Sequence, residues 1–127
     1  MTQPLFTIPA RLWGAIEAAQ SRKSFRIKVL HLEPLQGFAD FMIFLGGGSD
    51  RQNRAIADAI AEHFKALGEY PLAVEGMEEG NWVALDFGDL VFHVMNEEIR
   101  RFYALENLWK DAPKIEIPEE VPLNPLN

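Results

Sequence analysis

Residues 41–50 read FMIFLGGGSD, and they join the two elements that decide the fold. The first five are apolar on both faces, which is the pattern of a central strand covered on both sides. Three glycines then end the strand, and Ser49 can cap a following helix. Gln52 stands three residues further on, where it can reach back in an S-x-x-Q capping box. The stretch predicts a buried strand followed directly by a helix.

The helix after Ser49 has one apolar face and a clear end. Its apolar residues recur at helical spacing: Ile56, Ile60, Phe64 and Leu67. Gly68 follows the last of them and can adopt the left-handed conformation that commonly ends a helix. The spacing predicts a helix from about Asp50 to Leu67 that packs on the predicted strand.

A hairpin is predicted downstream, where residues 82–87 and 90–95 flank Gly88 and Asp89. The two-residue turn sets the register, which pairs Phe87 with Leu90, Leu85 with Phe92, and Val83 with Val94. One face of the hairpin is therefore wholly apolar and is expected in the core. The other face is mixed and carries Trp82, Ala84 and Asp86 opposite Met95, His93 and Val91. Such a face suits a partner or a covering helix.

The remaining segments complete an α/β pattern. A first helix is predicted from near Pro9 to Gln20, with apolar positions Leu12, Trp13, Ile16 and Ala19. Strands are expected at residues 25–32 and 71–75, with breaks at Pro34 and Gly37 and an exposed acidic connection at 76–81. Asn96 can cap a last helical region that breaks near Ala104, with apolar contacts from Ile99, Phe102, Leu105 and Trp109.

Together these elements predict one α/β domain, a mixed sheet of about five strands flanked by helices, over residues 1–111. Four of the eight prolines fall in the final 15 residues. Residues 112–127 are therefore predicted to form an extended or disordered tail outside the fold.

Composition limits the classes of function. The 127 residues carry a formal charge of −7, which disfavours direct affinity for nucleic acid and suits a basic protein partner. Without cysteine there is no disulfide, thiolate nucleophile or cysteine-ligated zinc. No signal-peptide pattern and no apolar run near the roughly 20 residues of a membrane span is seen. A cytoplasmic bacterial protein without membrane association is the expectation.

Candidate chemical motifs are weak. The loop 46–50 could bind phosphate through its backbone amides, but it lacks the lysine of a P-loop. A role in forming the turn and capping the helix is therefore favoured over phosphate binding. Asp50 and Asp58 do not match the metal-binding Asp-x-Asp spacing of nucleotidyltransferases. His31, His63 and His93 are scattered, so no metal site and no cofactor are expected. Asp86 and His93 are diagonal neighbours, for which a satisfied polar pair is favoured over a catalytic dyad.

Several segments resemble the Iojap family of ribosomal silencing factors, in the family's order and spacing from about Phe25 to Asp111. They are residues 38–41 (FADF), 47–52 (GGSDRQ), 57–58 (AD), 71–76 (PLAVEG), 82–89 (WVALDFGD), 91–95 (VFHVM), 101–103 (RFY) and 105–109 (LENLW). Gly48 is a departure, because the family usually has threonine there.

The resemblance implies a fold related to nucleotidyltransferases but lacking their catalytic acids, and no enzymatic activity. It implies binding to the large ribosomal subunit through large-subunit ribosomal protein fourteen. Steric exclusion of the small subunit would then repress translation under nutrient limitation. The implied contact surface is the face of Trp82, with Ala84, Asp86, His93 and Met95, and with Glu75 and Glu79 beside it.

Alternatives remain open at this stage. One is a diverged nucleotidyltransferase that uses the loop at Ser49, and another is a general protein-interaction module. The acidic residues Glu75, Glu78 and Glu79 are most simply a solvated loop, and Trp82 is equally compatible with a core position. A homodimer is also possible, since the sequence does not decide the oligomeric state.

Overall fold

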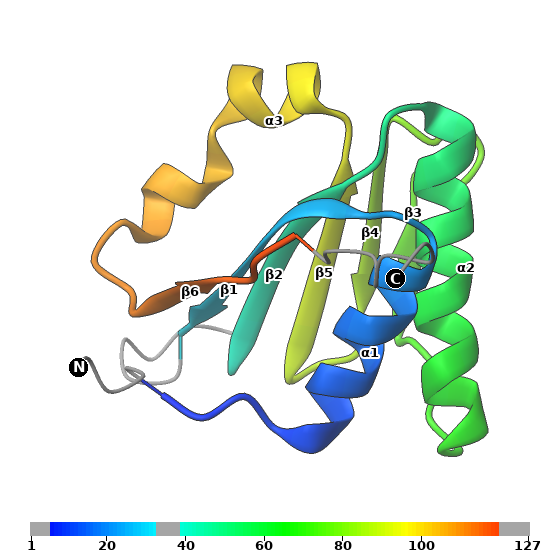
Figure 1. The fold of residues 1–127 in the computed structure, drawn as a ribbon, viewed down its shortest axis with the longest axis horizontal. Helices are drawn as coiled ribbons and strands as arrows, with labels where there is room; N and C mark the ends of the chain where they lie inside the picture. The colour runs from blue at the N-terminus through cyan, green and yellow to red at the C-terminus, as the bar shows by residue number, and fades with distance from the viewer. Residues whose placement is uncertain (1–5, 33–38, 120–127) are drawn as a thin grey trace, which may run out of the picture.

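The computed structural model describes residues 6–32 and 39–119, and these form a six-stranded mixed sheet of order β3-β4-β5-β2-β1-β6 (Figure 1). The strands are β1 (Phe25–His31), β2 (Phe41–Gly46), β3 (Ala73–Glu75), β4 (Trp82–Asp86), β5 (Leu90–Met95) and β6 (Lys114–Glu116). The helices are α1 (Ala10–Ser21), α2 (Asp50–Ala66), α3 (Glu97–Tyr103) and the 3-10 helix η2 (Leu105–Trp109). Strands β2 and β5 run parallel, and the other neighbours are antiparallel. The predicted α/β class with a mixed sheet is confirmed.

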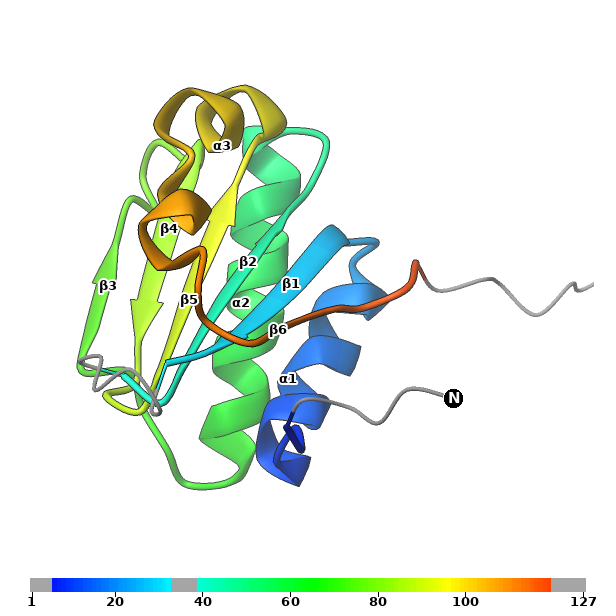
Figure 2. The same ribbon diagram turned by 90° about the vertical axis from the view of Figure 1, so that its left-hand side faces the viewer.

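Two layers cover the sheet, as Figure 2 shows from the side. Helices α1 and α2 lie together on one face, where their apolar residues and those of the sheet form the larger core cluster. On the other face, α3 and η2 lie over part of the sheet and enclose a smaller cluster around Phe44 and Met95. Every residue of β2 is buried, because this strand lies between β5 and β1 and is covered on both faces. The prediction from residues 41–45 is confirmed.

The start of α2 is capped nearly as predicted. The Ser49 hydroxyl accepts a hydrogen bond from Gln52 N at 3.0 Å. The Gln52 side chain, however, accepts from Gly48 N at 2.7 Å and not from Ser49 N, so the reciprocal bond falls one residue earlier than the capping box requires. Gly68 has φ +79° and ends the helix as expected, with its N–H and that of Glu69 bonded to Lys65 O and Phe64 O.

The hairpin register is confirmed. Phe87 N donates to Leu90 O, and β4 and β5 pair Leu85 with Phe92 and Val83 with Val94. The apolar face of this hairpin lies in the larger core cluster. Gly88 has φ +91°, which explains why glycine is needed at the first turn position.

Some predicted core positions are wrong. Trp13, Leu67 and Phe102 are exposed, and the buried face of α1 uses Ala15 where Trp13 was expected. Helical spacing marks a stripe wider than the area that the neighbouring elements cover, so its margins remain in contact with water. The connection at 76–81 is mostly exposed, but Gly80 is buried against α2. The predicted breaks at Pro34 and Gly37 lie outside the described residues.

The predicted end of the fold at Asp111 is also wrong. Residues 114–116 form β6, which pairs antiparallel with β1, and Ile117 N donates to Ile27 O. Ala112 and Ile117 are buried. The prolines at 113 and 118 flank the short strand, which is where proline is tolerated next to an edge strand. Residues 120–127 lie outside the described part of the chain. In the described part, no helix is long and apolar enough to cross a membrane.

Candidate partner-binding face

The sheet face bearing α3 is only partly covered. Helices α3 and η2 pack over β5, β2 and β1, so the ends of β3 and β4 remain open beside them. A groove of about 360 Å³ lies there, lined by Glu75, Gly76, Glu79, Asn81, Trp82, Ala84 and His93. Antiparallel pairing of β3 with β4 and of β4 with β5 brings Glu75, Ala84 and His93 into one row across the three strands. The structure therefore gathers five of the seven predicted contact residues.

Trp82 and His93 form the centre of the groove. Trp82 Nε1 donates to His93 Nδ1 at 3.0 Å. His93 also stacks on Phe44, with ring centroids 5.3 Å apart. Since Nδ1 accepts a hydrogen bond, the neutral ring carries its proton on Nε2. Burial lowers the pKa of His93 to about 4, so the ring stays neutral at pH 7.

The other predicted residues of this face have different roles. Asp86 Oδ1 accepts from Gly88 N at 2.8 Å and so closes the hairpin turn. In the described residues no bond joins Asp86 to His93, so the expected polar pair is wrong; Trp82 is the partner of the histidine. Met95 is only 1% exposed and belongs to the smaller core cluster, so it supports the face from beneath.

Two carboxylates stand on the rim of the groove. Glu75 and Glu79 are exposed, and no ion pair is formed by either within residues 6–32 and 39–119. Glu79 lies in the turn that carries the chain from β3 to β4, and its carbonyl accepts from Arg54 of α2. The groove thus combines an aromatic, uncharged floor with acidic rim groups that are free to meet a cation.

Sequence reasoning missed residues that support or extend this face. Asn53 is fully buried, accepts from Gly47 N and donates to Gly80 O, which ties α2 to the loop beside the groove. Arg100 is also buried and donates to Glu106. Tyr103 contacts Trp82, with ring centroids 5.1 Å apart. Asn53 continues the helical spacing of the buried Ile56 and Ile60, but its neighbours in the sequence are polar, so the sequence does not show whether it is buried or exposed.

The loop at Ser49 is built for capping. Gly47 N, Gly48 N and Gln52 N donate to side chains of this same loop and helix. A bound phosphate would have to replace these hydrogen-bond partners, which disfavours the hypothesis that the loop binds phosphate. Among the described residues, no group of three or more His, Asp or Glu side chains is placed to hold a metal ion.

Comparison with known proteins decides the family. The family model described as "Ribosomal silencing factor during starvation" matches residues 7–125. The chain belongs to the ribosomal silencing factor family. It is 34% identical over 103 residues to ribosomal silencing factor RsfS of Halalkalibacterium halodurans, covering 81% of this chain and 88% of that protein. The predicted Iojap resemblance is confirmed, and translation regulation is the function class of the family.

Other relatives of this chain come from organelles. It is 34% identical over 114 residues to the chloroplastic protein Iojap of Arabidopsis thaliana, covering 87% of this chain and 46% of that protein. It is 30% identical over 86 residues to mouse "mitochondrial assembly of ribosomal large subunit protein 1", covering 65% of this chain and 38% of that protein.

The fold of this chain also matches solved structures. A crystal structure of a protein from Chromobacterium violaceum superposes with a TM-score of 0.78 at 31% sequence identity. The match covers 96% of this chain and all of that chain. The six-stranded sheet with helices on both faces is therefore a fold already seen in a relative.

Proposed function

We propose that this protein binds the large ribosomal subunit through large-subunit ribosomal protein fourteen and excludes the small subunit by occupying its docking surface. Translation would then be repressed when nutrients are limited, in the cytoplasm, by binding and not by catalysis. Family membership supports the ribosomal role, and the mouse relative's name refers to the large subunit.

The observation that carries this proposal is the half-buried Trp82 in an acidic groove on the incompletely covered sheet face. Tryptophan at the centre of a groove is the residue type most enriched among interface anchors. The exposed carboxylates of Glu75 and Glu79 stand beside it and can attract a basic protein surface. The net charge of −7 disfavours affinity for the ribosomal RNA phosphates, which favours a protein contact as the main source of affinity.

The test is sedimentation of purified large subunits through a sucrose gradient with the protein added, followed by addition of small subunits. We expect the protein to migrate with the large subunit and to suppress subunit joining. Protein that stays at the top of the gradient would contradict the proposal, and protein that binds another partner in its place would favour the general interaction module.

Variants connect this activity to the groove. Trp82→Phe keeps an aromatic ring but removes the donor to His93, and Trp82→Ala removes the anchor as well. We expect the alanine variant to bind large subunits at least about tenfold more weakly. Trp13→Ala is the matched control, because Trp13 is an exposed tryptophan on α1. Equal loss in both alanine variants would place the binding surface elsewhere.

A diverged nucleotidyltransferase is the competing function. Its loop amides are already bonded within the protein, as described for Gly47, Gly48 and Gln52. If the loop bound nucleotide, nucleoside triphosphates with magnesium would raise the melting temperature of the protein in thermal unfolding. We expect no rise.

A further inference from the structure

A row of exposed apolar side chains continues from the groove onto α3. Phe102 is 79% exposed and Tyr103 52%, although both are large aromatic residues. The Tyr103 ring lies 5.1 Å from that of Trp82, and the Phe102 ring lies 5.0 Å from that of Tyr103. We call Trp82, Tyr103 and Phe102 the aromatic ledge. Exposed aromatic rings gathered at one site are a feature of interfaces, whereas single exposed apolar residues are ordinary.

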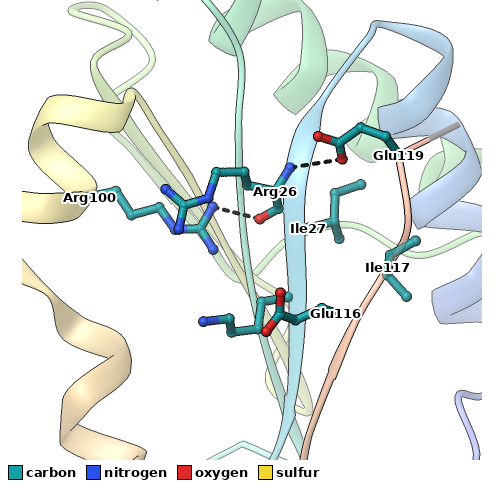
Figure 3. A pocket seen from close by; sticks show the side chains of 7 residues that line it. Arg26, Ile27, Arg100, Glu116, Ile117 and Glu119 are labelled. Carbon is teal, nitrogen blue, oxygen red and sulfur yellow. Dashed lines mark hydrogen bonds between the residues drawn. The ribbon is translucent and has the colours of Figure 1, made fainter.

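The ledge is held firmly, although the rings of Phe102 and Tyr103 are exposed. Arg100, on the inner side of α3, is 4% exposed and donates to Arg26 O of β1 and to Glu106 of η2. Figure 3 shows the Arg100 side chain reaching from α3 to the backbone of Arg26. Arg26 in turn bonds the side chain of Glu97 at the start of α3.

Both ends of α3 are defined as well. Asn96 Oδ1 accepts from Ile99 N, and Ala104 adopts a left-handed conformation that ends the helix. Phe102 and Tyr103 are therefore presented from a short helix anchored at its start, middle and end. A surface organised in advance loses little conformational entropy on binding, which favours affinity.

We infer that the aromatic ledge is the second half of the partner interface, and that Phe102 and Tyr103 contact an apolar part of a basic protein surface. This inference rests on the proposed function and extends it. The charge of the region supports a basic partner: the groove beside the ledge has the exposed Glu75 and Glu79 on its rim and a neutral His93 on its floor. A cationic side chain of the partner would pair with the rim while its apolar neighbours cover the rings.

Phe102 is the cleaner residue to change, because its ring touches Tyr103 and is otherwise mostly in water. Phe102→Ala leaves Trp82 and His93 undisturbed, whereas Tyr103→Ala removes a ring that packs on Trp82. Tyr70→Ala is the matched control, since Tyr70 is 65% exposed and follows the far end of α2, away from α3 (Figure 1). Thermal unfolding of Trp82→Ala, Phe102→Ala and Tyr70→Ala checks that the fold is kept.

The measurement is the dissociation constant of fluorescently labelled protein for purified large ribosomal subunits, for wild type, Trp82→Ala, Phe102→Ala and Tyr70→Ala. We expect Phe102→Ala to weaken binding about tenfold, with an unchanged melting temperature, and Tyr70→Ala to bind like wild type.

Three results would overturn the inference. If Trp82→Ala weakens binding but Phe102→Ala does not, the interface ends at the groove and only the proposed function stands. If wild type fails to bind large subunits, the proposed function fails and the inference fails with it. If Phe102→Ala keeps its affinity but converts a dimer into a monomer in analytical ultracentrifugation, the ledge joins two copies of this chain.

Discussion

The indole Nε1 of Trp82 donates its hydrogen to Nδ1 of His93 over 3.0 Å, so the anchor of the groove depends on a histidine that is neutral. A protonated ring would carry a hydrogen on Nδ1, and two donors would then face each other. The groove therefore holds its geometry only while His93 is uncharged. Burial, which lowers the pKa of this histidine to about 4, protects that state.

We predict that His93 makes the protein less stable in acid. In the folded state its pKa is about 4, and in the unfolded state it returns to about 6.5. Between these values the unfolded chain binds more protons, so the free energy of unfolding falls as the pH is lowered from 6.5 to 4. The slope for one such group approaches about 1.4 kcal/mol per pH unit.

Urea unfolding at pH 7, 5.5 and 4.5 measures this effect. The His93→Gln variant lacks the ring that titrates. The free energy of unfolding of wild type relative to this variant should therefore fall steadily as the pH is lowered. A constant difference across the three pH values would show that His93 does not carry the effect.

Glu106 is predicted to be the strongest contributor among the ion pairs. Desolvation acts to raise its pKa, but hydrogen bonds from Arg100 and Lys28 outweigh it and lower the pKa. Glu106→Gln would leave the buried Arg100 without its counter-charge, which costs about 3 kcal/mol. Because the folded-state pKa is lowered, this contribution is present at neutral pH and is lost as the pH falls through that value. Glu98→Gln, at an exposed position of α3, is the control and should stay within about 0.5 kcal/mol of wild type in urea unfolding.

Gly46 is predicted to tolerate no side chain. A Cβ atom there would lie 2.1 Å from Met95 O, a backbone atom of the adjacent strand β5. Gly46→Ala should therefore push β2 and β5 apart and cost about 3 kcal/mol. At Gly48 a Cβ atom lies 3.3 Å from Gln52 Oε1, the end of a flexible side chain, so Gly48→Ala should change stability by less than about 0.5 kcal/mol. Calorimetric melting distinguishes the two, and equal melting temperatures would contradict the packing argument.

Asn53 is predicted to join the two loops at one end of the sheet. Asn53→Ala leaves Gly47 N and Gly80 O without their partner in a buried place, each at a cost of about 1–3 kcal/mol. Amide hydrogen exchange at Gly47 should become faster in the variant. Unchanged exchange would indicate that water replaces the lost side chain.

The sequence predicted those parts of the fold that depend on local pattern. Gly88 determines the turn, the turn determines the hairpin register, and the register places Ala84 opposite His93. Ser49 and Gly68 likewise marked the ends of α2, because capping needs specific residue types at specific positions.

What the sequence could not predict depends on contacts between distant segments. The alternation of β5 places Met95 on the mixed face, as predicted. Helices η2 and α3 bury it there, and the sequence of the hairpin alone does not indicate that burial. Phe102 has helical spacing, yet its side chain is mostly in water, and its ring contact among the described residues is with Tyr103. The strand at 114–116 is three residues long, too short for an alternating pattern, and pairing with β1 alone defines it.

The position of β6 has a consequence for synthesis of the chain. Strand β1 is made early and β6 late, yet they are neighbours in the sheet. Until residues 114–116 have been added, the outer edge of β1 has no pairing partner, and an unpaired edge is where strands of other molecules associate. The nascent protein thus completes its sheet only after β6 has been synthesised, so translational pauses between β1 and β6 would prolong the period in which it is prone to aggregate.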